Sequence, residues 1–193
     1  TMWRGPVEVP NPTREDVWEP GEATAPGGRA EIGKLDARLQ SVLHSLLGHQ
    51  RQFDLGDESI LAEHAQVDLT GEVPQIQVGR MSYRALVVPP ALTLRPTTLK
   101  LIEAFREAGG IVYCCGDPPT LVNGEPSTMP ARVLDSVPRS TVDAIGSAMH
   151  EALAPLLECS AANTLREHVI AHVRRDGPRR LVYLVNSSRR FEG

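Results

Sequence analysis

Residues 83–119 read YRALVVPPALTLRPTTLKLIEAFREAGGIVYCCGDPP, and this stretch decides the fold class. Ala85–Val88 is a short apolar run that suits a strand buried on both faces of a parallel sheet. Pro96 is typical of a first helical turn, where its missing N–H costs nothing, and Gly109-Gly110 is typical of a helix end. Ile111–Cys115 is a second apolar run. The pattern predicts two parallel strands joined by a right-handed helical crossover.

Side-chain spacing within this unit predicts which residues are buried. Leu99, Ile102 and Phe105 recur at helical spacing and are expected to face the sheet, while Arg106 is expected to stay in water. Cys114 and Cys115 are neighbours on a strand, so their side chains are expected on opposite faces of the sheet.

The chain before this unit predicts a helix from about Ala30 to Gln50, followed by a short strand at Gln52–Leu55. The apolar stripe of that helix is Leu35, Leu39, Val42, Leu43, Leu46 and Leu47. Asp57 or Ser59 is expected to cap a short helix over Ile60–Ala65. Alternating apolar residues around Thr70-Gly71-Glu72 predict a hairpin.

The chain after this unit predicts a loop-rich region from Thr120 to Arg139, with a turn at Asn123-Gly124. A helix is expected from about Thr141 to Leu157, where Pro155 would disturb the last turn. Alternation over His168–Val173 and Leu181–Val185 then predicts an antiparallel hairpin, with His172 and Tyr183 facing each other across it.

These elements predict an α/β fold with a doubly wound, mostly parallel sheet and a C-terminal antiparallel hairpin. Residues 1–30 are rich in proline and glycine and are expected to form an arm or linker, which Trp3 and Trp18 pin onto the domain. Residues 31–160 form the α/β domain. Residues 161–193 form a hairpin that completes the sheet or leads into a β-sandwich outside this chain. A chain that starts without methionine and stops just after a strand is expected to be a piece of a longer protein.

Composition excludes several classes of partner and cofactor. The net charge of −4 argues against nucleic acid and against an anionic membrane surface. No apolar run reaches membrane length. Three cysteines make no disulfide framework, which favours a reducing compartment such as the cytoplasm. No zinc-ligand spacing and no glycine-rich phosphate loop occur, so neither a metal nor a cofactor is expected.

A ligand pocket is geometrically reasonable where the strands end, because open α/β sheets bind ligands at the carboxyl ends of their strands. Its candidate residues are Asp54, Asp57, Pro90, Cys115 and Asp117. Each has a simpler structural interpretation. Asp54, Asp57 and Glu58 form a carboxylate group, but Asp57 suits a helix cap and Glu58 the positive helix start. Asp117 suits a tight turn.

Cys115-Gly116 at a strand end invites a nucleophile hypothesis, in which Cys114 or Cys115 pairs with His150, His168 or His172 as the base. The local sequence argues against it. Gly116 is followed by Asp117-Pro118-Pro119 and not by a helix whose N-terminus would lower the pKa of the thiol. Buried cysteines also commonly act as small apolar residues. No catalytic residue is assigned on these grounds.

Four motifs in order resemble those of large bacterial glycoside hydrolases of the α-L-rhamnosidase and β-galactosidase-like type. They read FDLGDESIL, VGRMSYRALVVPP, LIEAFREAGGIVYCCGDPP and VIAHVRRDGPRRLVYLVNSS, and the resemblance covers roughly Leu35 to Ser188. In that family a catalytic barrel is followed by a flavodoxin-like domain similar to class I glutamine amidotransferases, and then by a β-sandwich. The resemblance implies that this chain is the generally non-catalytic amidotransferase-like domain. The paired catalytic carboxylates of the family belong to the barrel and correspond to no residue here.

Two functional hypotheses follow from the sequence. The first is a structural or assembly domain of a multidomain glycosidase, whose partners are neighbouring domains of the same polypeptide and, in a homo-oligomer, other copies; it predicts an exposed apolar patch. The second is a stand-alone amidotransferase-like enzyme or small-ligand-binding module. It predicts a thiol of lowered pKa, or a pocket at the strand carboxyl ends. A sugar-binding module is disfavoured by an aromatic content of 4%.

Overall fold

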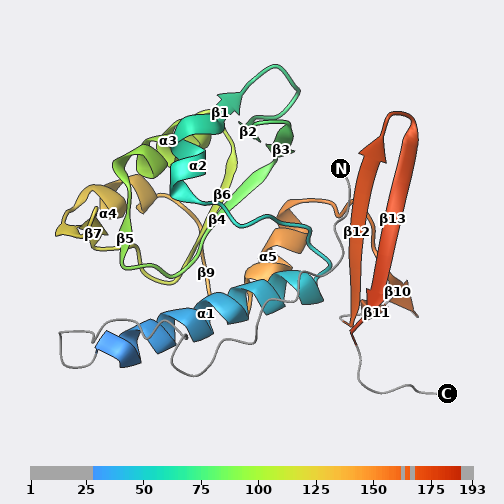
Figure 1. Cartoon of the computed structure of the whole chain (residues 1–193), viewed down its shortest axis with the longest axis horizontal. Coiled ribbons are helices and arrows are strands. Elements are labelled where there is room, and N and C mark those ends of the chain that lie inside the picture. Colours follow the sequence, from blue (N-terminus) through green and yellow to red (C-terminus); the bar gives the residue numbers. More distant parts are fainter. Residues whose placement is uncertain (1–27, 162–163, 166–167, 188–193) are drawn as a thin grey trace, which may run out of the picture. The chain divides into compact units, whose positions relative to one another are not determined.

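The computed structural model describes residues 28–161, 164–165 and 168–187 (Figure 1). The chain divides into two units, residues 1–34 and residues 35–193. Described residues 28–34 of the first unit begin helix α1 (Gly28–Gly48), which continues into the second. The arm predicted for residues 1–30, including Trp3 and Trp18, lies almost wholly outside the described residues.

The second unit contains four further described helices and thirteen described strands. In chain order these are α2 (Glu58–His64), β1 (Ala65–Asp68), β2 (Gln75–Val78), β3 (Met81–Tyr83), β4 (Ala85–Val88), β5 (Thr93–Leu94), α3 (Pro96–Glu107), β6 (Ile111–Cys115), β7 (Leu121–Val122), β8 (Glu125–Pro126), α4 (Met129–Leu134), β9 (Arg139–Ser140), α5 (Ile145–Ala152), β10 (Ser160–Ala161), β11 (Thr164–Leu165), β12 (Val169–Asp176) and β13 (Arg179–Asn186).

The predicted β-α-β unit is confirmed. Strands β4 and β6 pair in parallel from Ala85 opposite Ile111 to Val88 opposite Cys114. Helix α3 between them begins at Pro96, and Gly109 follows its end at φ 88°, a conformation that glycine adopts without strain. The two-residue strand β9 adds in parallel to the other edge of β6, so the sheet order is β4-β6-β9.

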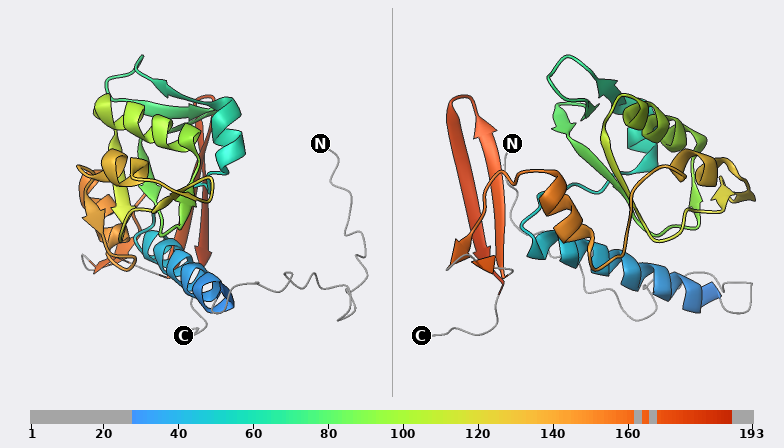
Figure 2. Two further views of the ribbon diagram at one scale, coloured as in Figure 1. Left: turned by 90° about the vertical axis from the view of Figure 1, so that its left-hand side faces the viewer. Right: turned by 180° about the vertical axis from the view of Figure 1, so that it is seen from behind.

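Helices cover both faces of this parallel sheet (Figures 1 and 2). On one face α3 and α4 pack against Val112 and Cys114 of β6. On the other face α1 and α5 pack against Cys115. The two cysteines therefore point to opposite faces, as predicted. The buried side chains are Leu99, Ile102, Phe105, Val133 and Leu134 on the first face and Val42, Leu46, Ile145 and Met149 on the second.

The start of α5 packs closely on α1. A Cβ atom at Gly146 would clash with the Ser45 carbonyl group, so only glycine permits this approach. The Ser45 hydroxyl accepts a hydrogen bond from Gly146 N at 3.0 Å and donates one to Asp143 O at 2.6 Å. Ala144 at the N-cap has no side-chain oxygen of its own. Ser45 thus caps α5 from a different helix.

The segment after α5 is tied back to the end of α1 by one buried side chain. The Gln50 amide donates to Cys159 O at 3.0 Å and accepts from Cys159 N at 2.7 Å. Gln50 is buried and has a positive φ of 55° where α1 ends. Its amide therefore pairs with a main chain more than a hundred residues away in the sequence, much as a neighbouring strand would.

Smaller predicted elements are also confirmed. Asp57 caps α2, accepting from Ser59 N at 2.8 Å and Ile60 N at 3.0 Å. Strands β1 and β2 form the predicted hairpin. Asn123 and Gly124 both have positive φ and form the turn between β7 and β8.

Four local predictions were wrong. Gln52–Leu55 forms no strand, because Phe53 packs into the core beside α1 while Asp54 is exposed and bonds to Tyr83. The region from Thr120 to Arg139, predicted to be loop-rich, contains the β7–β8 hairpin, α4 and the start of β9. Helix α5 ends at Ala152, since Leu153 is already extended two residues before Pro155. Arg106 is half-buried, because Nη1 donates to Val133 O at 3.1 Å and Ser136 Oγ at 2.7 Å.

The C-terminal antiparallel hairpin is confirmed, with β12 and β13 in register from Val169 opposite Asn186 to Asp176 opposite Arg179. His172 faces Tyr183 across it, with ring centres 6.4 Å apart. Among the described strands the hairpin pairs with no third strand. No helix in the described part of the chain is both long enough and apolar enough to cross a membrane.

Candidate functional site

The carboxyl end of β6 is closed by two arginines. Gly116 follows the strand with φ 79°. Arg139 Nη1 donates to Gly116 O at 2.8 Å, and Arg38 Nη2 lies 2.6 Å from the position that a Cβ of Gly116 would occupy. Asp117, the next residue, is exposed. The guanidinium groups of Arg139 and Arg38 therefore both lie against the main chain of Gly116, at the end of the strand.

Neither cysteine at this end of β6 is poised for nucleophilic chemistry. Burial is the main cause that raises the pKa of the Cys115 thiol to about 11, and the neighbouring Cys114 adds to the effect while Arg38 opposes it. Burial also raises the pKa of Cys114, against the opposing charge of Arg139, whose Nη1 is 3.8 Å from Sγ. Thiolates are the reactive form, so both groups are held in the unreactive one at neutral pH.

The acidic residues that follow α1 have structural partners. Asp57 caps α2, and its hydrogen bonds from Ile60 N and Ser59 N lower the pKa of its carboxyl group. Glu58 Oε1 accepts from Arg95 N at 2.8 Å, at the N-cap position of α3. The two carboxylates thereby satisfy main-chain donors at the starts of two helices.

Asp54 is bound by a residue at the other end of the sheet. Its Oδ2 accepts a 2.7 Å hydrogen bond from the Tyr83 hydroxyl group. Burial, followed by this hydrogen bond and the charge of Asp54, raises the pKa of Tyr83 to about 12. Tyr83 precedes β4, whereas Asp117 follows β6, so the two residues lie at opposite ends of a parallel pair of strands.

The five residues of the predicted pocket fall into separate environments. Cys115 and Asp117 lie at the end of β6, and Pro90 is buried after β4. Asp57 caps α2, and Asp54 accepts a hydrogen bond from the Tyr83 hydroxyl group. No hydrogen bond or ion pair among the described residues links Asp54 or Asp57 to Cys115 or Asp117. The described strands follow chain order across the parallel sheet, so they contain no reversal point of the kind where such sheets bind ligands.

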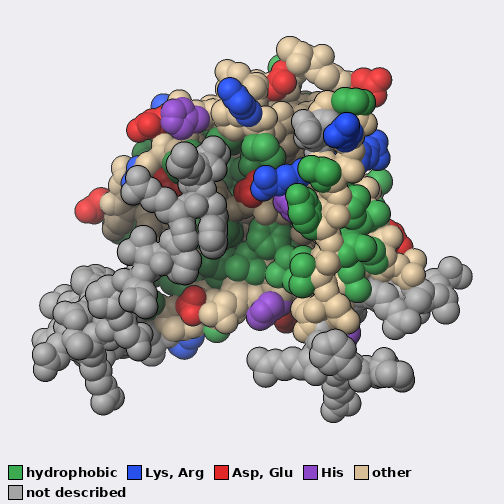
Figure 3. Space-filling model, turned by 45° about the vertical axis from the view of Figure 1, so that its right-hand side comes forward, with side chains coloured by type: hydrophobic (Ala, Val, Ile, Leu, Met, Phe, Trp, Pro, Cys, Tyr) green, Lys and Arg blue, Asp and Glu red, His purple; other side chains and the backbone are tan. Residues whose placement is uncertain are grey.

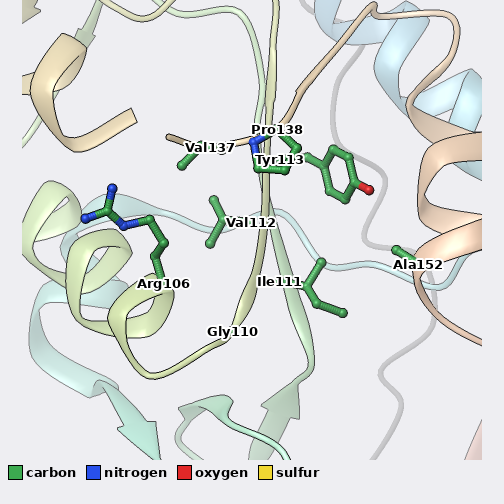
Figure 4. Close-up of a pocket in the computed structure, with 8 residues that line it drawn as sticks. All are labelled: Arg106, Gly110, Ile111, Val112, Tyr113, Val137, Pro138 and Ala152. Carbon is green, nitrogen blue, oxygen red and sulfur yellow. The ribbon is translucent and has the colours of Figure 1, made fainter. Parts of the chain in front are cut away.

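A cleft of about 350 Å³ opens instead along the amino-terminal half of β6 (Figure 4). Ile111 and Tyr113 point to one side of the strand and Val112 to the other, so the cleft straddles the strand edge. Ala152 reaches it from α5 and Arg106 from α3. Its remaining lining residues are Gly110, Val137 and Pro138. Sequence reasoning missed this cleft, although Pro138 was a usable signal because proline cannot donate to a strand ladder.

A basic cluster surrounds the chain that leads into β4. Burial lowers the pKa of Arg51, the nearby charge of Arg84 lowers it further, and Glu158 opposes the shift. Glu158 Oε2 lies 3.8 Å from His150 Nε2, and Arg84 Nη2 donates to Ala154 O at 3.3 Å. Glu158 therefore supplies the counter-charge. The cluster joins the end of α1 to the segment after α5.

The hairpin exposes apolar side chains on both faces. Residues paired in register share a face, so one face carries Val169, Ala171, Val173, Val182 and Leu184. Tyr183, Leu181 and Val185 point to the other face, and all five apolar residues of β13 are 44–56% exposed. Figure 3 shows these apolar side chains (green) gathered along the hairpin. Isolated two-stranded hairpins are marginally stable in water, so this surface needs a partner.

Neither a search for metal sites among the described residues nor comparison with known proteins identifies a function for any residue. Among the described residues no group of three or more His, Cys, Asp or Glu side chains is placed to hold a metal ion. The chain matches no protein-family model, no curated protein and no solved structure.

Proposed function

We propose that this chain is a non-catalytic structural domain of a large glycoside hydrolase. In this proposal the α/β body is a flavodoxin-like, amidotransferase-like domain, and the hairpin docks onto a β-sandwich of the same polypeptide. The catalytic barrel, with its paired carboxylates, lies elsewhere in that polypeptide. The role of this domain is to hold its neighbours, and in a homo-oligomer other subunits, in fixed positions.

The observation that carries the proposal is the hairpin. Five consecutive apolar residues, Leu181–Val185, are exposed on β13, and its outer edge has no strand partner among the described residues. A surface of this kind is expected where one domain packs on another, and unexpected on a free monomer. The four sequence motifs that resemble those of glycoside hydrolases support the choice of parent protein.

The enzyme hypothesis has less support. An amidotransferase-like nucleophile requires a thiol of lowered pKa at the strand end, and burial raises the pKa of Cys115 to about 11. Alkylation by iodoacetamide tests this point directly. Cys115 in the folded chain is expected to react no faster than in the unfolded chain, whereas reaction at least tenfold faster would support the enzyme hypothesis.

The decisive test of the proposal is the reading frame around the coding segment. A long upstream frame encoding repeated strand–helix units with glutamates at strand ends, and a downstream frame encoding a β-sandwich, would support a structural domain of a glycosidase. A start codon directly before Thr1 together with a stop codon directly after Gly193 would overturn it.

A further inference from the structure

Among the described residues, no strand pairs with one edge of the amino-terminal half of β6. Cys114 N donates to Pro138 O at 3.0 Å and Gly116 N to Ser140 O at 3.0 Å, so these groups face β9. Alternate residues of a strand direct their main-chain groups to the same side, so Val112 N–H and C=O face this edge too. Pairing with β9 begins only at Cys114. No hydrogen bond among the described residues joins Val112 to a neighbour on this side.

Pro138 is the reason that the ladder stops there. If β9 continued, the N–H at position 138 would donate to Val112 C=O, and proline has no N–H. The chain before Pro138 turns away, and Val137 becomes buried at the cleft wall. The edge of β6 from Gly110 to Val112 therefore faces the cleft and not another strand.

The surroundings of this edge suit a short extended peptide. On one side of the sheet Ile111, Tyr113 and Ala152 flank it, whereas the Val112 side chain on the other side is buried beneath α3 and α4 (Figure 4). The volume of about 350 Å³ is near the lower end of the range for ligand sites. A strand added to a sheet edge gains its affinity from main-chain hydrogen bonds and its specificity from such side-chain contacts.

We propose that a short extended segment of a partner polypeptide, carrying small apolar residues, binds in this cleft as an added strand parallel to β6. Its main chain bonds to Val112 N–H, Val112 C=O and Gly110 C=O. Its side chains on one side contact Ile111, Tyr113 and Ala152. A second copy of this chain fits less well, because its exposed strand β13 is eight residues long and carries Tyr183 and two leucines, whereas the open edge spans about three residues. This site is independent of the proposed domain role.

The test uses the 193-residue chain and a pentapeptide of sequence threonine-valine-alanine-valine-threonine, acetylated and amidated at its ends. Hydrogen exchange of the Val112 amide is followed by NMR, with the Cys114 amide as an internal control already bonded to Pro138. Saturating peptide is expected to slow exchange at Val112 at least tenfold and leave Cys114 unchanged. The same peptide with N-methyl groups on its central amides is expected to bind roughly tenfold more weakly, because it lacks the donors.

Two variants test the site from the protein side. Ala152→Phe fills the cleft from its exposed rim and should abolish peptide binding, whereas Ala131→Phe, on the exposed face of α4, should not. Pro138→Ala supplies an N–H that can donate to Val112 C=O, so it should compete for one of the peptide's hydrogen bonds and weaken peptide binding. The proposal is overturned if the peptide leaves Val112 exchange unchanged, or if the N-methylated peptide binds equally well. It is also overturned if the chain self-associates and protects Val112 unaided, because the occupant is then a second copy.

Discussion

Cys114 and Cys115 are adjacent in β6 but belong to different cores, and burial controls the chemistry of both thiols. An acid whose pKa is raised by folding keeps its proton in the native state while the unfolded chain loses it. The unfolded state is then favoured as the pH rises above the ordinary thiol pKa, and this effect stops growing at the folded pKa. For Cys115 that upper limit is about 11.

The free energy of unfolding is therefore expected to fall between about pH 9 and pH 11, because Cys115 must bind one more proton in the folded state than in the unfolded state over that range. Urea unfolding at several pH values measures it. Cys115→Ala should be less stable at pH 7 and show a shallower decline above pH 9. An equal decline in both proteins would contradict the assignment to this thiol.

At Gly146 the size of the side chain is expected to affect the free energy of unfolding, because the residue packs against the main chain of α1. Gly146→Ala places a methyl group against the Ser45 carbonyl group, so α5 must move away from α1. Such overpacking is expected to lower the free energy of unfolding by about 1–3 kcal/mol. Gly33→Ala is the matched control, since nothing lies within 4 Å of its Cβ position in α1. Alanine favours helix there and should add up to about 1 kcal/mol. Similar results for both variants in denaturant titrations would argue against the close helix contact.

At the scale of elements, α5 depends on another helix for its start. Its N-cap residue, Ala144, offers no side-chain acceptor, and the Ser45 hydroxyl of α1 bonds both Gly146 N and Asp143 O. The apolar spacing predicted that this helix would begin at Thr141. The cap from Ser45 explains why α5 begins at Ile145 instead. The cap comes from a residue 101 positions earlier, so no local pattern reveals it.

Ser45→Ala removes both of these hydrogen bonds and is expected to lower the free energy of unfolding by about 1–2 kcal/mol. Ser147→Ala serves as the control, because that hydroxyl bonds only to Ala144 O within the same helix turn. Its effect should be within about 0.5 kcal/mol. Thermal melts of both variants measure the difference, and equal melting temperatures would show that the cap from α1 contributes nothing.

Sequence patterns predicted the elements whose signals are local and strong. The run from Ala85 to Cys115 combined apolar strands, a starting proline and an ending glycine pair, and each part formed as expected. The register of the hairpin followed from alternation in the same way. The errors occurred where tertiary contacts override local preference, as at Phe53, which packs beside α1 instead of joining a sheet. Strand β9 was missed because two residues carry no periodic signal.

The candidate site was less predictable than the fold. Asp57 was correctly expected as a cap, because capping depends on neighbours in the sequence. The partners of Asp54 and Glu58 are Tyr83 and Arg95, which come from distant parts of the chain. Predicting the cleft beside β6 would have required knowing where β9 begins. Pro138 indicates that point only once β6 and β9 are known to be neighbours.

At the scale of the whole molecule, the exposed hairpin determines how the isolated chain behaves in solution. One of its faces carries five apolar residues beside Arg180 and Asn186, while Arg174 and His172 add polarity to the other. A chain with such a surface is expected to bind the dye ANS and to self-associate at high concentration.

Val182→Lys combined with Leu184→Lys introduces charge on the apolar face and is expected to reduce ANS fluorescence by roughly half, with less self-association in sedimentation. Tyr183→Lys combined with Leu181→Lys changes the opposite face and is the matched control, with a smaller expected effect. If neither pair alters dye binding or sedimentation, the hairpin is not the interaction surface.

The Gln50 amide has a mechanical consequence for the chain when its C-terminal part is pulled. A pull on the chain beyond residue 159 reaches Gln50 through its two bonds with Cys159 before it can unwind α5. Both bonds join the same pair of residues, so they must rupture together and not one after the other. Tension applied through the hairpin is thereby transmitted to the long helix α1, and Gln50 acts as a clamp that shields the smaller helix from the load.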